Sequence, residues 1–364
     1  MRIRRGGAMI THRGFFRLSF GISVAAGLAG HTRYAFAGQP TTVALVKSPN
    51  RAQGLGVAID LLDLNSIRGK RIVLKPNFNS RDAFPGSTHN DTLLALIDKL
   101  SGMGASSCTV ADRSGMGNTR DVMEHKGILD LAQEIGFDPI VIDEIPADQW
   151  IPIAVEDGHW KRQLFFPKLF LEADGIVQTC CLKTHQFGGH FTLSLKNSVG
   201  MIAKRSPVDG YDFMQELHSS AHQRRMIAEV NSLYAPDLIL LDAMEGFVTG
   251  GPAIGKKVAP GVMIAGTDRV AVDAVGVAIL RRYGTTADVR RGEIFEQEQI
   301  ARAAELGIGI DSPIRISFAV PDEASAAFVD EITPFLTPDD AALGVGPGGS
   351  MRSMKSTWAR IKSE

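Results

Sequence analysis

The chain contains 364 residues, of which 44% are hydrophobic and 22% are charged, a composition typical of a globular protein with a substantial core. Its 39 basic and 40 acidic side chains give a net charge of −1, which argues against a nucleic-acid-binding protein that depends on a broad basic surface. Its three cysteines are too few for a disulfide framework, and without a C-x-x-C motif they argue against an iron–sulfur cluster held by this chain alone.

The first 37 residues are predicted to form an export signal rather than part of the fold. After a basic start, they carry a Gly/Ala-rich apolar run at 18–30 and end in Ala35-Phe36-Ala37, an A-x-A cleavage signature. Residues 11–17 are similar to a twin-arginine motif, with His12 in place of the first arginine. Because the apolar run is too short to span a membrane, we expect a periplasmic or otherwise exported protein, cleaved near Ala37 and with no membrane span afterwards. The alternative is a cytoplasmic protein whose synthesis starts near Met9 or later.

Strands and helices alternate through the first half of the remaining chain. The strands expected from short apolar runs are 41–47, 71–75, 107–112 and 139–143, and the helices expected between them are 54–64, 93–100, 121–124 and 128–135. This alternation is typical of right-handed crossovers in a mainly parallel sheet. We therefore predict an α/β fold, with helices flanking a mainly parallel sheet, in a single domain over residues 41–320.

Residues 150–166 interrupt this alternation, because their mixed polar and aromatic content favours a hairpin or irregular segment at which a second lobe could begin. The alternation then resumes with expected strands at 173–180, 237–242, 261–266 and 314–320 and expected helices at 213–233, 268–280 and 301–306. From residue 337 to 364, Gly, Pro, Ser and basic residues dominate without a core-forming stripe, which predicts a disordered tail.

The segment Cys180–Met201, directly after the predicted strand 173–180, carries the densest group of chemically active side chains. They are Lys183, His185, His190, Lys196 and Asn197, with the glycine pair Gly188 and Gly189 between them. The glycines allow backbone to approach a ligand closely. Lysines and histidines just past the carboxyl end of a strand suit a small anion, such as phosphate or carboxylate, or a metal ion bound by imidazole. The alternative is a solvated basic loop.

Polar side chains also follow other predicted strands, namely Lys75, Asn77, Asp112, Asp242 and Glu245. Because the carboxyl ends of parallel strands meet at one edge of a sheet, we expect these residues to share one cleft with Cys180–Met201. The predicted catalytic residues are Lys183, His185, Asp242 and Glu245, and the predicted ligand- or cofactor-binding residues are Lys75, Asn77, Gly188, Gly189, Lys196 and Asn197. In this interpretation the lysines hold an anion, the imidazole transfers protons or binds metal, and the carboxylates supply the acidic partner.

A divalent metal could be bound by His218 and His222, four residues apart on the predicted helix 213–233, with His185 as a further ligand. The segment is not an H-E-x-x-H motif, because Ser219 stands where that motif has its glutamate. The alternative is a pair of solvent-facing histidines.

These residues together resemble the domain-of-unknown-function family 362, over about residues 43–310. The motifs that carry the resemblance are Lys75-Pro-Asn77, Leu182-Lys-Thr-His185, Leu195-Lys-Asn197 with Gly200, His218, Asp242 with Glu245-Gly246, Gly251-Pro252, and Gly266-Thr-Asp268 with Ala271-Val-Asp273. The resemblance implies the fold and the location of the site. Members of this family are often joined to ferredoxin-type clusters, which implies a redox partner, but this chain has no such cluster.

A fainter similarity links the His185-x-x-Gly-Gly segment and Lys196 to loops of the lactate racemase family, which binds a nickel-pincer nucleotide. Three functions therefore stay open. The first is an enzyme acting on or with a small anionic ligand or metal-bound cofactor. The second is a non-catalytic periplasmic binding or accessory protein using the same cleft, and the third is a racemase-like enzyme.

Overall fold

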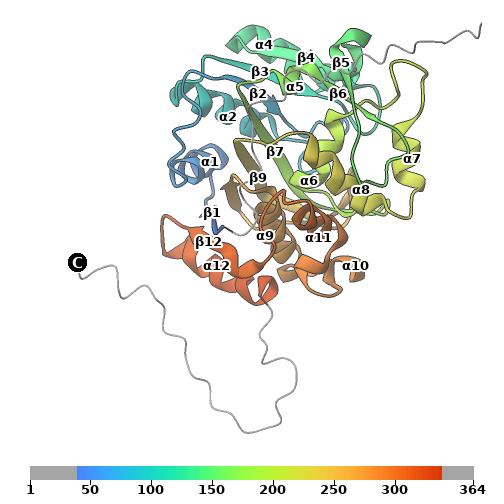
Figure 1. Cartoon of the computed structure of the whole chain (residues 1–364). Coiled ribbons are helices and arrows are strands. Elements are labelled where there is room, and N and C mark those ends of the chain that lie inside the picture. Colours follow the sequence, from blue (N-terminus) through green and yellow to red (C-terminus); the bar gives the residue numbers. More distant parts are fainter. Residues whose placement is uncertain (1–38, 338–364) are drawn as a thin grey trace, which may run out of the picture. The chain divides into compact units, whose positions relative to one another are not determined.

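The computed structural model describes residues 39–337 (Figure 1). The export signal predicted at 1–37 and all of the predicted tail except Thr337 lie outside these residues. The predicted fold class is confirmed, since one large and mostly parallel sheet is flanked by helices. No helix in the described range is long and apolar enough to cross a membrane.

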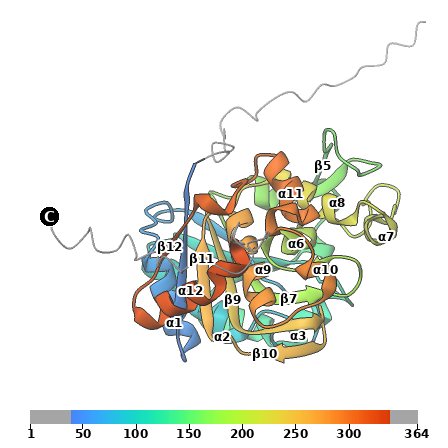
Figure 2. The same cartoon turned by 90° about the horizontal axis from the view of Figure 1, so that it is seen from below.

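The strands are β1 (Thr41–Lys47), β2 (Arg71–Lys75), β3 (Ser107–Asp112), β4 (Asp138–Val141), β5 (Trp150–Ile153), β6 (Leu164–Pro167), β7 (Gly175–His185), β8 (His190–Phe191), β9 (Leu238–Gly250), β10 (Gly255–Val258), β11 (Val262–Gly266) and β12 (Ile316–Ala319). The main sheet has the order β12-β1-β11-β9-β7-β2-β3-β4. Its consecutive strands β9, β7, β2, β3 and β4 are parallel, whereas β11 is antiparallel to both of its neighbours. Figure 2 shows β9 between β11 and β7.

The helices are α1 (Arg51–Asp60), α2 (Asn90–Gly102), α3 (Thr119–His125), α4 (Ile128–Ile135), α5 (Lys168–Leu171), α6 (Ser194–Asn197), α7 (Phe213–Ser219), α8 (Gln223–Val230), α9 (Arg269–Arg282), α10 (Ala287–Arg290), α11 (Glu298–Glu305) and α12 (Glu323–Leu336). Short 3₁₀ turns occupy Ile142–Glu144, Ala147–Gln149, Ser198–Met201, Asn231–Leu233, Ile294–Glu296 and Pro313–Arg315.

Both faces of the sheet are buried, because successive strand residues point to opposite faces. In β1, Val43 and Leu45 join a core with α9, α11 and α12, whereas Ala44 and Val46 join a core with α1, α2, α3 and α4. In Figure 1, α1 and α2 lie to the left of β7 and β9, and α6, α8 and α11 lie to their right. This burial on both faces explains why the strands read as continuous apolar runs.

The segment expected to begin a second lobe belongs to the same domain. It forms the hairpin of β5 and β6, as one of the two sequence interpretations proposed. Trp150 and Phe166 of this hairpin share a hydrophobic core with Val73 and Ile176 of the main sheet. The hairpin therefore extends the side of the sheet that carries α7 and α8.

The fold also continues beyond the predicted limit at residue 320. Helix α12 buries Phe328, Ile332 and Leu336 in the same core as α9. Asp322 begins this helix by accepting a hydrogen bond from the Ser325 N–H. The sequence does contain this signal, an aspartate followed by apolar residues at helical spacing.

Candidate functional site

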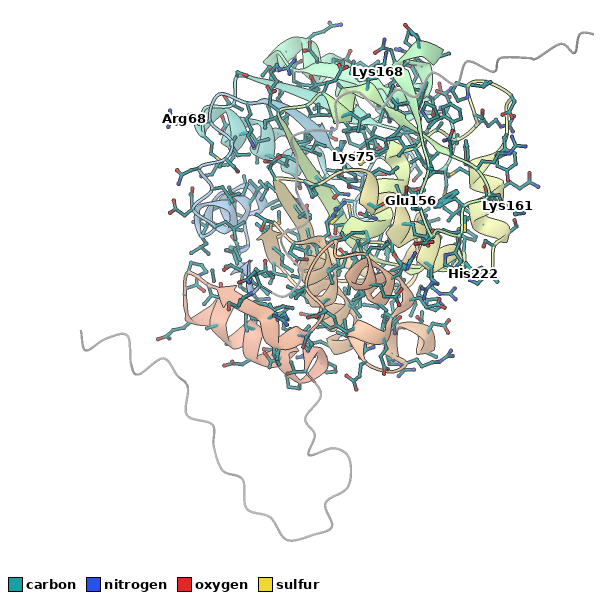
Figure 3. All side chains as sticks on the ribbon, viewed as in Figure 1. Arg68, Lys75, Glu156, Lys161, Lys168 and His222 are labelled. Carbon is teal, nitrogen blue, oxygen red and sulfur yellow. The ribbon has the colours of Figure 1, made fainter. Side chains whose placement is uncertain are left out.

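A cavity of about 450 Å³ opens where β2, β3 and β7 end. Its lining comes from the residues after β2 and β3, from the end of β7, and from α6 and α7. These three strands are parallel neighbours, so their carboxyl ends lie at one edge of the sheet. Figure 3 shows Lys75, the last residue of β2, near the centre of the view. The volume lies within the range of small-molecule sites, roughly 300–1,000 Å³.

An ion pair between Lys75 and Asp112 forms one wall of the cavity. Lys75 Nζ lies 2.5 Å from Asp112 Oδ1, and both side chains are buried. Asp112 Oδ2 also accepts a hydrogen bond from the Phe78 N–H at 2.6 Å. Burial lowers the pKa of Lys75 and raises the pKa of Asp112, and the mutual attraction opposes both shifts. The carboxylate is thus already neutralised by the protein itself.

Two asparagines connect this pair to a second buried lysine. Asn197 Oδ1 accepts hydrogen bonds from Lys75 Nζ at 3.1 Å and from Asn77 Nδ2 at 3.4 Å. Asn77 Oδ1 in turn accepts a hydrogen bond from Lys183 Nζ at 2.8 Å. Lys183 also donates to the Gly86 carbonyl at 2.5 Å, and burial lowers its pKa. Lys183 therefore lies behind Asn77 and does not line the cavity itself. Its ammonium orients the Asn77 amide, because it donates to the amide oxygen.

Arg113 adds a guanidinium that no carboxylate in the described range contacts. Its Nε donates to the Ile202 carbonyl at 2.9 Å, and its Nη atoms donate to the Val199 and Ser114 carbonyls. The side chain is fully buried and lines the cavity, and this burial lowers its pKa. Backbone carbonyls satisfy the hydrogen-bond donors but leave the net positive charge in place.

Lys196 of α6 is the third cation in the lining. Its Nζ makes no hydrogen bond or ion pair with any residue between 39 and 337. Burial, together with the positive charges of Arg113 and Lys183, lowers the pKa of Lys196 to about 8. At neutral pH this ammonium is still mostly protonated, so the cavity presents an unpaired positive charge.

The position of α6 is set by Asp273 of α9. Its Oδ1 accepts a hydrogen bond from the Ser194 N–H at 2.8 Å, and its Oδ2 accepts one from the Leu195 N–H at 3.0 Å. These N–H groups belong to the first turn of α6, and the first N–H groups of a helix have no acceptor within the helix. Asp273 therefore holds the helix that carries Lys196 and Asn197, whereas Asp268 alone caps α9 by accepting from the Ala271 N–H.

His185 presents a neutral imidazole to the cavity. Burial, followed by the charges of Lys196, His218 and Lys183, lowers its pKa to about 2. Its Nδ1 accepts a hydrogen bond from the Gly189 N–H at 3.3 Å, so the ring proton is on Nε2. A side chain at Gly189 would lie 2.8 Å from Nδ1, which explains the glycine at this position. His185 can consequently donate a hydrogen bond through Nε2 while remaining uncharged.

His218 has the opposite tautomer. Its Nδ1 lies 2.7 Å from the Met214 carbonyl oxygen, which can only accept, so Nδ1 carries the proton and Nε2 has a free lone pair. Partial desolvation and the charge of Lys196 lower the pKa of His218, which favours the neutral ring, although the residue keeps contact with solvent. The two imidazole rings stack with centroids 6.5 Å apart, and both line the cavity. One histidine can thus donate a hydrogen bond while the other accepts a proton.

The structure brings together most of the residues predicted to share a cleft. The cavity lining includes Lys75, Asn77, Asp112, His185, Lys196, Asn197 and His218. Lys183 lies directly behind this lining, as described above. Gly189 lies against His185, whereas Gly188 is exposed outside this cavity and binds through its carbonyl to Arg224.

Asp242 and Glu245 do not belong to the site, and their predicted role as its acidic partners is wrong. Strand β9 does not end at Asp242 but continues to Gly250, with a register shift opposite Cys181 and Leu182. Asp242 points to the face covered by α1 and α2, where it pairs with Arg51 Nε at 2.9 Å and Thr92 Oγ1 at 2.5 Å. Glu245 forms an exposed ion pair with Lys257.

The predicted metal site is also wrong. The helix expected over 213–233 is interrupted between α7 and α8, so His218 and His222 do not share a helical face. The ring of His222 instead packs 4.3 Å from that of His159, near the right-hand edge of Figure 3 and away from Lys75. Between residues 39 and 337, no three His, Cys, Asp or Glu side chains are grouped so that they could hold a metal ion.

The sequence interpretation missed several cavity residues, among them Arg113 and Asn79, and it named Gly200 only as part of a family motif. Arg113 follows Asp112 directly at the end of β3, which is a signal that could have found it. Asn79 Nδ2 is buried without a hydrogen-bond partner in the described range, as expected for a donor that serves a ligand. The physical reason for Gly200 could not be predicted from the sequence, because it depends on the distance of this residue to Lys75 in space.

No curated protein matches this sequence. A solved structure that is similar is the lactate racemase apoprotein from Thermoanaerobacterium thermosaccharolyticum. It has 14% sequence identity to this chain and a TM-score of 0.42, and the match covers 79% of this chain and 85% of that one.

A family model with the description "Domain of unknown function (DUF362)" matches residues 72–278. The matched range begins in β2 and ends in α9, and it contains every cavity residue discussed above together with Asp273. It spans more than half of the chain, so this protein belongs to the DUF362 family.

Proposed function

We propose that the cavity binds a small organic anion and that the protein is an enzyme that moves a proton to or from this ligand. The observation that carries the proposal is the unpaired ammonium of Lys196 beside the Arg113 guanidinium. In the described lining, the single carboxylate is Asp112, which Lys75 already neutralises. A cavity with an excess of positive charge and little competing negative charge favours a carboxylate or phosphate.

The two histidines supply the chemistry. His218 Nε2 has a lone pair that can accept a proton, and its lowered pKa keeps that lone pair available at neutral pH. His185 Nε2–H can donate a hydrogen bond to an oxygen on which negative charge develops. The geometry thus supports removal of a proton from an anionic substrate, with Lys196 and Arg113 stabilising the added charge.

The anion site can be tested by titration calorimetry of the purified protein with a panel of small carboxylates and phosphates. We expect Lys196→Gln to weaken binding at least about tenfold, because it removes the unpaired charge. The matched control is Lys161→Gln, which removes an exposed lysine that does not line the cavity. Equal affinities for wild type and Lys196→Gln would contradict the proposal.

The pKa of Lys196 gives the site a pH dependence. Because this pKa is about 8 in the free protein, affinity should be constant near neutral pH and fall as pH rises above about 8, when the ammonium loses its proton. In Lys196→Arg the charge persists, so the loss above pH 8 should disappear. A wild-type affinity that is unchanged up to pH 10, together with an equal affinity of Lys196→Gln at neutral pH, would show that Lys196 is not the anion ligand.

The enzymatic half of the proposal needs a separate measurement. Ligands that bind should exchange a C–H proton for deuterium in D₂O, followed by NMR, and His218→Ala should slow this exchange about a hundredfold or more while binding changes little. The similarity of the His185-x-x-Gly-Gly segment to racemase loops adds lactate to the panel. Tight binding without exchange of any ligand would favour the non-catalytic binding protein instead.

Export is the second part of the proposal, supported by the basic start, the apolar run and the A-x-A signature before Gly38. A periplasmic location would give the site access to anions outside the cytoplasm.

A further inference from the structure

The mouth of the cavity carries large apolar side chains that are exposed to solvent. Phe187 is 52% exposed and Met116 is 44% exposed, and both belong to the cavity lining, as does Met214. A cavity of about 450 Å³ exceeds what a bare phosphate or acetate fills. The cations can hold only the charged group of a ligand, and the apolar side chains of the lining are available to the rest of it.

The position of Phe187 is fixed by α8. The Phe187 carbonyl accepts a hydrogen bond from Gln223 Nε2 at 3.1 Å, and the following carbonyl, that of Gly188, accepts one from Arg224 Nη1 at 2.9 Å. Gly188 has φ +81°, and a side chain there would lie 2.3 Å from Gln223 Oε1. The backbone of the segment is therefore held against α8, and residues 39–337 leave about half of the Phe187 side chain exposed at the mouth.

The Phe187 ring also contacts His185, the proposed hydrogen-bond donor to the ligand. Phe187 packs edge-on against His185, with ring centroids 5.8 Å apart. A ligand group that covers Phe187 would therefore also lie close to the Nε2–H donor of His185. An exposed aromatic side chain gains most of its burial energy only when another apolar surface covers it.

Met116 reaches the cavity from the loop after β3. Its N–H donates to the Asn79 carbonyl at 2.8 Å, which fixes the backbone. Its unbranched thioether side chain can adapt to ligands of different shape. The rim thus combines one fixed aromatic ring with one flexible apolar side chain.

We propose that the ligand is an amphipathic organic anion, with a carboxylate or phosphate head at Lys196 and Arg113 and an apolar tail packed against Phe187 and Met116. This inference rests on the proposed anion site and adds the class of its ligand. It predicts that affinity rises with the apolar part of the molecule at constant charge.

The test is a calorimetric comparison of acetate with hexanoate, and of inorganic phosphate with phenyl phosphate, on the whole purified protein. If the site binds carboxylates, hexanoate should bind at least about tenfold more tightly than acetate, and if it binds phosphates, phenyl phosphate should do so relative to inorganic phosphate. The reason is that each buried methylene contributes roughly fourfold in affinity. The two pairs distinguish a carboxylate head from a phosphate head.

Substitution of Phe187 by alanine should remove most of this advantage and leave the affinity for the tail-less anion within about twofold. Phe187→Leu should restore part of it, because the apolar surface returns. Val208→Ala is the matched control, since Val208 is 80% exposed and does not line the cavity. Lys196→Gln should weaken both members of the pair equally.

The outcomes separate the two proposals. One outcome is that short and long anions bind wild type with equal affinity and that Lys196→Gln binds neither. This outcome would overturn the apolar subsite and leave the anion site standing. Tail-dependent binding that Phe187→Ala does not change would also overturn this subsite. Failure of every probe to bind would overturn the anion site and the inference that rests on it.

Discussion

Gly200 shows how closely the backbone after α6 packs against Lys75 and Arg113 in the wall of the cavity. A side chain at this position would lie 2.9 Å from Lys75 Nζ and 3.0 Å from the Arg113 carbonyl oxygen. Its backbone does not take positive φ, so the glycine provides space rather than conformational freedom. The close approach of this backbone to the Lys75 ammonium therefore depends on the absence of a side chain at residue 200.

We expect Gly200→Ala to weaken anion binding at least about tenfold, because the added methyl group either displaces Lys75 or enters the cavity. The contact with backbone cannot relax easily, so a stability cost of about 1–3 kcal/mol should accompany it. Calorimetric titration and chemical denaturation measure the two effects.

Gly56→Ala is the control for this substitution. Gly56 lies in α1, and a methyl group added there would have no atom within 4 Å, so the change should leave binding intact and stabilise the helix by about 0.5–1 kcal/mol. Equal binding by both variants would show that the space at Gly200 is not used.

At the residue scale, the sequence predicted the lysines and His185 of the site better than its acids. Lys75, His185 and Lys196 were found because they follow or end apolar runs. Asp242 was misplaced because a polar residue after an apolar run reads as the end of a strand. In the structure β9 continues beyond Asp242 to Gly250, because β10 pairs with its last residues. The hydrogen bonds to a neighbouring strand allow a polar segment to remain extended.

At the scale of elements, α6 depends on α9 for its position. This four-residue helix is too short to be stable alone, and Asp273 provides the acceptors for its first N–H groups. Burial raises the pKa of Asp273 to about 7, because the hydrogen bonds only partly offset the cost of a buried charge. The element that carries two site residues is thus tied to a group that titrates near neutral pH.

Asp273→Asn should change how stability depends on pH. The pKa of Asp273 rises from 3.8 to about 7 on folding, so the folded state binds the proton more tightly. Its contribution to stability is therefore fully present below pH 3.8 and is lost as pH rises through 7. Because asparagine does not titrate, the melting temperature of the variant should improve relative to wild type between pH 4 and 8.

Melting curves of both proteins across that range measure the difference. Other titrating groups cancel in the comparison, including His185, whose lowered pKa has the opposite effect on stability. A constant difference in melting temperature would indicate that Asp273 keeps the same protonation state in the folded and unfolded chains.

The helix predicted at 213–233 illustrates what sequence spacing cannot decide. Its apolar residues do fit a helix, and Phe213, Leu217, Met226 and Ile227 are all buried. The backbone leaves the helical conformation at Ser220, which has φ −81° and ψ 136° and whose N–H donates to the Leu217 carbonyl. Apolar spacing therefore gave the element type but did not predict where the helix is interrupted.

At the scale of the whole molecule, the order of strands and helices along the chain was predictable from the sequence. Which strands pair with each other, and in which direction, was not. Alternation of short apolar runs with helical segments gave the α/β class. The pairing of β11 antiparallel to β1 and β9 had no signal in composition, because buried strands look alike in either direction. The convergence of β2, β3 and β7 nevertheless followed from their parallel order.

The proposed export signal makes a prediction about the intact protein. Because β1 begins at Thr41, cleavage after Ala37 would remove residues outside the described fold and leave Gly38 as the new N-terminus. Mass spectrometry of protein from the periplasmic fraction should find this species. Replacement of Ala35 and Ala37 by larger polar residues should leave the uncleaved chain, and a mature protein that retains Met1 would contradict the prediction.

The network from Lys183 through Asn77 and Asn197 to Lys75 and Asp112 joins five residues from separate parts of the sequence, at the end of β2 and just after it, at the end of β3, and in β7 and α6. An unfolded chain has no such arrangement, so a molecule recognised by this network binds the native state alone and shifts the folding equilibrium toward it. Heating the protein with a metabolite library and scoring increases in melting temperature would therefore search for the physiological ligand without any assumption about the reaction.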